Sequence, residues 1–114
     1  MIKFSVIPDS FVRVYIHNRI KLVDQTPQDI QRSLVLLVAL LGSTPSLELE
    51  KFVANFCRIE RVDPSSMLQA VKHLVVIYDV LRREIPAQEI EWLKGDIEAV
   101  YDEQVTSRNR INYS

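Results

Sequence analysis

Two apolar runs decide the fold of this chain: Leu34-Val-Leu-Leu-Val-Ala-Leu-Leu41 and Leu74-Val-Val-Ile-Tyr-Asp-Val-Leu81. Both are too apolar to lie on a surface, and both are shorter than the roughly 20 apolar residues that a transmembrane helix needs. Arg32 interrupts the first run on one side, and a Gly-Ser-Thr-Pro sequence ends it on the other. We therefore expect two buried core helices in a soluble globular protein.

Length and composition indicate one compact, helix-rich domain. The chain has 114 residues, of which 47% are apolar and 25% are charged, and it contains only two glycines. The 14 basic residues nearly balance the 15 acidic ones, which argues against a protein that binds mainly phosphate backbones or anionic membranes. Cys57 is the only cysteine, so an internal disulfide is excluded, and the first residues lack the pattern of a secretory signal. The expected location is the cytoplasm.

The alternation of apolar and polar residues near the start of the chain predicts a short antiparallel β-meander over 1–24. Residues 2–6 alternate in this way, and a Pro-Asp-Ser sequence with the composition of a turn follows at 8–10. Two more strands are predicted over 11–16 and 20–23, joined by a three-residue turn, because that loop length keeps one face apolar. The other face would carry Arg13 and Lys21 and form a basic hairpin surface.

Four helices are predicted after the meander. Thr26 and Asp63 are each followed by proline, and a capping residue before a proline at the first helical position marks a helix start. The first of these helices ends at Gly42, and Ser46 can cap the second. The third runs to about residue 84, and Pro86 either begins a fourth helix or kinks the third.

The predicted fold class is therefore α+β and mostly α. A short meander would pack on a four-helix bundle that contains two strongly apolar central helices. The single domain would cover 1–105, with the meander in 1–24 and the helical part in 26–105. The remaining segment, 106–114, is polar and is expected to be a flexible tail.

No signature of an enzyme or of a cofactor site rises above background in the sequence. Two glycines cannot supply a glycine-rich phosphate loop. Cys57 has apolar neighbours at helical spacing, as a buried structural thiol has. Neither His17 nor His73 has a second histidine or a carboxylate at metal-ligand spacing. We expect no catalytic residue, no cofactor and no metal.

Two apolar surfaces point to a protein partner instead. In the third predicted helix, Val76 and Val80 fall inside the polar sector, beside His73 and Arg83. In the last helix, Trp92 lies opposite the apolar stripe, and tryptophan is strongly enriched among interface anchors. These residues predict a non-enzymatic protein–protein interaction module, such as an adaptor, a chaperone-like factor or an assembly subunit. Its partner would be another protein or a second copy, with a homodimer expected. The alternative is that the meander covers the valines and that the tail or the strands cover the tryptophan.

A second hypothesis is a small nucleic-acid-binding regulator. The segment 47–84 could form a helix-turn-helix-like pair, although any two packed helices share this pattern. Binding would then use either that pair or the basic hairpin face. The residues concerned are Arg58, Arg61, Gln69 and Lys72 on the helices, and Arg13 and Lys21 on the hairpin.

Overall fold

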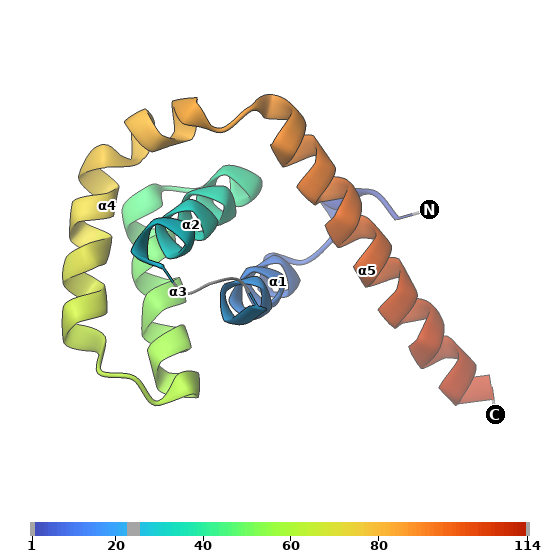
Figure 1. The fold of residues 1–114 in the computed structure, drawn as a ribbon. Coiled ribbons are helices and arrows are strands. Elements are labelled where there is room, and N and C mark those ends of the chain that lie inside the picture. The colour runs from blue at the N-terminus through green and yellow to red at the C-terminus, as the bar shows by residue number, and fades with distance from the viewer. Residues whose placement is uncertain (1, 23–25, 114) are drawn as a thin grey trace.

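The protein is all-α in the part of the chain that the structure describes. The computed structural model describes residues 2–22 and 26–113, with side chains as far as Arg108. This part contains one 3-10 turn and five α-helices, and no strand (Figure 1). The elements are η1 (Phe4–Val6), α1 (Asp9–Leu22), α2 (Pro27–Leu41), α3 (Pro45–Glu60), α4 (Pro64–Glu84) and α5 (Ala87–Tyr113).

Helix α2 lies at the centre of the fold and packs against each of the other four helices (Figure 1). Its residues Leu34–Val38 and Leu40 are all buried, as expected of a helix that is apolar around most of its circumference. Helices α3 and α4 form a hairpin on one side of α2, with α4 at the outer edge, and α5 lies on the other side (Figure 1). The predicted central position of the 34–41 run is confirmed. That of the 74–81 run is wrong, because α4 lies at the edge of the fold and only its inner side is covered, which leaves Val76 and Val80 exposed (Figure 1).

The helix boundaries follow local signals in the sequence. The hydroxyl of Thr26 accepts a hydrogen bond from the backbone N–H of Asp29 at 3.2 Å and caps α2. Gly42 ends that helix with a left-handed φ of 62°, a conformation that costs glycine little. Asp63 caps α4 by accepting from the N–H of Ser65 at 3.2 Å. These three signals were predicted correctly.

Two boundaries differ from the sequence prediction or complete it. Helix α3 begins at Pro45 with Thr44 at the N-cap position, so the predicted cap at Ser46 lies inside the first turn. Ile85 has an extended backbone between α4 and α5, and Pro86 therefore separates two helices. Helix α5 then continues through most of the segment predicted as a flexible tail and ends at Tyr113.

The predicted α+β class is wrong, because the segment assigned to the meander forms η1 and α1. Apolar residues in this segment fit two periods. Val12, Val14 and Ile16 alternate as in a strand, whereas Val12, Ile16 and Ile20 are spaced by four as in a helix. The helix brings the second set to one face and buries all three against the core, while Val14 is 55% exposed. The helical period is favoured because it buries a whole stripe against α2.

The supposed turns of the meander are parts of this helix. The carbonyl of Pro8 accepts hydrogen bonds from the N–H groups of Phe11 and Val12, at 3.0 and 3.3 Å, so the Pro-Asp-Ser sequence starts α1 instead of a hairpin. The predicted second turn, over 17–19, lies within the C-terminal half of α1. Residue 23, the end of the last predicted strand, lies outside the described residues. None of the described helices has the length and apolar character that crossing a membrane requires.

Candidate protein-interaction surfaces

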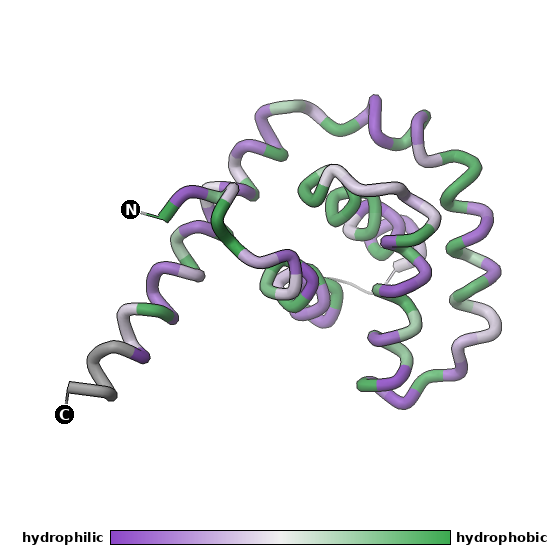
Figure 2. Tube along the Cα trace, turned by 180° about the vertical axis from the view of Figure 1, so that it is seen from behind, coloured by the Kyte–Doolittle hydropathy of each residue, from purple (hydrophilic) through white to green (hydrophobic). Residues whose placement is uncertain are grey.

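The outer face of α4 carries an apolar patch that points away from the core. Val71 and Leu74 are buried on the inner side of the helix, whereas Val76 and Val80 are 80% and 58% exposed. Apolar and polar residues alternate along this edge of the molecule (Figure 2). Residues 2–22 contain η1 and α1 and no strand, so the meander that was the alternative cover for the valines is absent from the described part of the chain. We define the α4 outer face by the exposed residues of this sector: Gln69, Lys72, His73, Val76, Asp79, Val80 and Arg83.

Trp92 forms a second exposed surface, on α5. Its side is opposite the buried residues Ile90, Leu93 and Ile97, and the tryptophan is 63% exposed. Helices α4 and α5 share no extensive contact in the described part of the chain. The structure therefore brings His73, Val76, Val80 and Arg83 together on one face, as predicted, and leaves Trp92 apart from them.

The residues of the nucleic-acid hypothesis are dispersed over different elements. Arg58 donates a hydrogen bond to the side-chain oxygen of Asn55 at 2.7 Å, and Arg61 ends α3 with a left-handed φ of 57°. Gln69 and Lys72 belong to the α4 outer face. They do not share one basic stripe with the two arginines, which lie at the end of α3.

The predicted basic hairpin face is also wrong, because Arg13 and Lys21 lie on α1 and face α3. Arg13 forms an ion pair with Glu48 through two hydrogen bonds, the one from Nη2 to Oε2 being 3.1 Å long. Glu48 is only 5% exposed, and a buried carboxylate is tolerated when a cation neutralises it and hydrogen bonds satisfy its oxygens. The hydrogen bonding to Glu48 raises the pKa of the Arg13 guanidinium. The charge of Arg13 is thus used inside the fold.

A second polar contact between α1 and α3 involves His17. The His17 Nε2 atom lies 2.7 Å from Oε1 of Glu60, and the Lys21 ammonium lies 3.4 Å from the same oxygen. The imidazole also packs on the ring of Phe56, with 4.6 Å between ring centroids. The hydrogen bond from His17 lowers the pKa of Glu60. His17 therefore has a structural role in this arrangement, and its sequence position gave no sign of the pairing.

Helix α1 is tied to α5 as well. The hydroxyl of Tyr15 donates a hydrogen bond to a carboxylate oxygen of Asp96, and burial together with this bond raises the pKa of Tyr15 to about 12. The ring of Phe11 meets that of Tyr101 edge to face at 4.9 Å between centroids. At the N-terminal end, the backbone N–H of Phe4 donates to Glu98 at 2.9 Å. Sequence reasoning missed these pairs because their members are about 80 to 95 positions apart.

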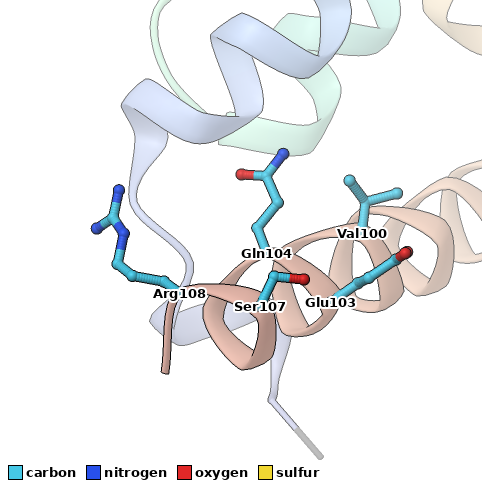
Figure 3. A pocket seen from close by; sticks show the side chains of 5 residues that line it. All are labelled: Val100, Glu103, Gln104, Ser107 and Arg108. Atoms are coloured by element: carbon cyan, nitrogen blue, oxygen red, sulfur yellow. The ribbon is translucent and has the colours of Figure 1, made fainter. Parts of the chain in front are cut away.

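Shallow grooves run on both sides of α1. One of about 590 Å³ lies between α1 and α3 and includes the His17–Glu60 pair, and one of about 450 Å³ lies between α1 and α5 beside Tyr15 and Asp96. A third, of about 540 Å³, follows the end of α5 (Figure 3). There Gln104 and Arg108 extend toward the N-terminal part of the chain (Figure 3). Glu103 is five positions before Arg108, so these two charges do not meet on one helix face.

The side chains that could ligate a metal ion lie scattered over the part of the chain that the structure describes. No three His, Cys, Asp or Glu side chains of that part gather closely enough to hold a metal ion. Cys57 is buried, as predicted, and burial raises the pKa of its thiol, which disfavours the reactive thiolate. No family model, curated protein or solved structure matches the chain.

Proposed function

We propose that this protein is a non-enzymatic protein–protein interaction module that associates with itself. The observation that carries the proposal is the exposure of Val76 and Val80, one turn apart in the middle of α4. Single apolar side chains are common on protein surfaces, but these two form one patch on a regular helix. Burying a valine completely is worth roughly 1.5 kcal/mol or more, and a symmetric contact would bury the patch of both copies.

The polar groups of the fold support the same function. The carboxylates, the tyrosine and the histidine that could have served a catalytic site instead join α1 to α3 and α5. What remains on the α4 outer face is apolar at its centre and charged at its margin, the usual composition of a protein interface. Trp92 is the other proposed contact residue, because an exposed tryptophan removes a large apolar area from water when a partner covers it.

The test is the molar mass in solution, measured by light scattering over a dilution series. We expect a concentration-dependent mass that approaches twice the 13.2 kDa of one chain. Val76→Glu should shift the series toward the monomer, because dimerisation would bury a carboxylate without a partner. Leu47→Glu is the matched control, since Leu47 is also an exposed apolar residue on a helix but lies on α3. It should leave the mass unchanged.

A wild-type mass of one chain at every concentration would contradict self-association. Circular dichroism on each variant shows whether it has kept its helices. The variant Trp92→Ala, measured in the same series, assigns the second surface: a loss of mass would place Trp92 in the self-contact, and an unchanged mass would reserve it for another protein.

A further inference from the structure

Lys72 and Asp79, at one margin of the α4 outer face, carry opposite charges that cannot pair with each other within one chain, although Arg83 lies four residues after Asp79. Lys72 and Asp79 are seven residues apart, which is close to two helical turns, so both lie along the same side of the valine patch. Along the axis they are about 10 Å apart, and side chains on one helix meet only at spacings of three or four. Among the described residues, neither takes part in an ion pair.

In a dimer, each Lys72 can pair with Asp79 of the other copy, which makes two such contacts. In a two-fold antiparallel pairing of helices, the two faces are the same surface and each margin meets the same margin of the partner. A residue near one end of the face then lies beside a residue near the other end. We infer that two copies pack α4 against α4 in this way, about an axis beside Val76, so that Lys72 of each copy pairs with Asp79 of the other.

The charges select this register over its neighbours. With Lys72 beside Asp79 of the second copy, the two Val76 side chains meet at the axis, and Val80 lies between Gln69 and His73 of that copy. Shifting the helices so that Val76 meets Val80 instead would set Lys72 beside Arg83 and bring the two Asp79 carboxylates together. Like charges placed opposite one another oppose association. Of these two registers, the first satisfies both the apolar patch and the charged margin.

The position of α4 allows this contact. The helix lies at the outer edge of the molecule with α3 and α2 behind it (Figure 1), so a second copy can approach the outer face without meeting another element. One helix pair buries less than the roughly 1,200 Å² that marks small specific interfaces. We therefore expect a weak dimer, with a Kd in the micromolar range or above. The dilution series must for that reason extend to high protein concentration.

The inference deepens the proposed self-association, and a charge exchange between two variants tests it separately. Lys72→Asp alone and Asp79→Lys alone each place like charges at both contacts, and each should weaken association by about 10-fold or more at low salt. When the two variants are mixed in equal amounts, both contacts regain opposite charges. The mixture should therefore form a heterodimer, with an affinity near that of the wild type.

The control for this mixture is Lys51→Asp, which makes the same change in net charge on α3, away from the proposed contact. If general attraction between oppositely charged proteins caused the recovery, Lys51→Asp would recover association with Asp79→Lys as well. We expect it to fail. The double variant Lys72→Asp/Asp79→Lys should associate with itself like the wild type.

The outcomes separate the geometry from the function. A wild type that associates while both single variants keep its affinity, or while their mixture stays monomeric, would overturn the antiparallel pairing and leave the self-association in place. A wild type that is monomeric throughout would overturn both.

A cross-link gives a second measurement that does not depend on charge variants folding. Val76→Cys should form a covalent dimer with oxidised glutathione, because residues beside the axis come within the Cα separation of a disulfide. Val62→Cys, an exposed position outside α4, should react far more slowly, as should the wild type with its buried Cys57. Equal rates at positions 76 and 62 would also overturn the pairing.

Discussion

Helices α1 and α4 are both amphipathic, but their polar sides serve opposite purposes. In α1, Arg13 and His17 bind carboxylates of α3, and Tyr15 binds a carboxylate of α5. In α4, the described side chains of the outer face form no ion pair and no hydrogen bond to another element. The first helix is held from three directions, and the second is held by its inner face alone.

This difference indicates which surface is free to act. A charged group with a partner inside the fold is already neutralised, and a ligand that competes for it must first break that pairing. The α4 outer face has no such cost, because its charges are solvated and its valines have no cover. The number of charges on a helix is therefore a poor guide to its function until the partner of each charge is known.

The largest effect should come from the core side of α1. Ile16 is fully buried, and truncating a buried isoleucine to alanine typically costs about 2 to 5 kcal/mol. We expect Ile16→Ala to lose stability in that range in urea unfolding. Val76→Ala and Val14→Ala remove exposed side chains and should change the free energy of unfolding of the monomer by about 0.5 kcal/mol or less. A loss at Val76 as large as that at Ile16 would mean that the α4 outer face is covered within one chain.

A smaller effect is expected when the buried ion pair is broken from its cationic side. Arg13→Met retains much of the aliphatic contact but leaves the carboxylate of Glu48 buried without a cation, which should cost about 2 to 3 kcal/mol. Glu48→Gln should cost less, because the guanidinium left behind is one-third exposed and can be hydrated. Lys72→Met is the matched change on α4 and should be near neutral in urea unfolding of the monomer. If Arg13→Met and Lys72→Met lost the same free energy of unfolding, the contrast between the two helices would not hold.

The sequence predicted the helices that carry explicit boundary signals. The capped prolines at Thr26 and Asp63, the glycine at 42 and the two apolar runs act within a few residues, so their effects can be recognised locally. The place of Val76 and Val80 in the polar sector of their helix was also predictable, because it depends on the geometry of one helix. Their exposure was not, because it depends on whether another element covers them. Segment 1–24 lacked such a signal: its apolar spacing fits both periods, and only packing on α2 favours the helix.

The pairings of α1 could not be predicted from one sequence. Glu48 is an unremarkable acidic residue in the first turn of α3, and its burial results from the approach of Arg13 across the helix interface. The error about the meander then carried over into function, since it placed Arg13 and Lys21 on an exposed basic face. Assigning the strand period to the apolar residues of this segment thus led to the prediction of a basic surface that the folded chain does not have.

The smallest expected effect concerns pH and the Glu60 cluster. The hydrogen bond from His17 lowers the pKa of Glu60 in the folded chain below its ordinary value of 4.5. The folded state therefore favours the ionised carboxylate, so this contribution to stability is complete above that ordinary value and is lost as the pH falls through the lowered pKa. Glu60→Gln should be less stable than the wild type near about pH 6, and the gap should close toward about pH 3.

Asp79→Asn, on the helix without internal pairing, is the control for a general effect of removing an acidic residue. The measurement is the urea midpoint of each protein at the two pH values, at concentrations low enough to keep the chain monomeric. A gap for Glu60→Gln that stays constant with pH would show that the carboxylate acts through packing alone, and α1 would then be tied to α3 mainly by the Arg13–Glu48 pair.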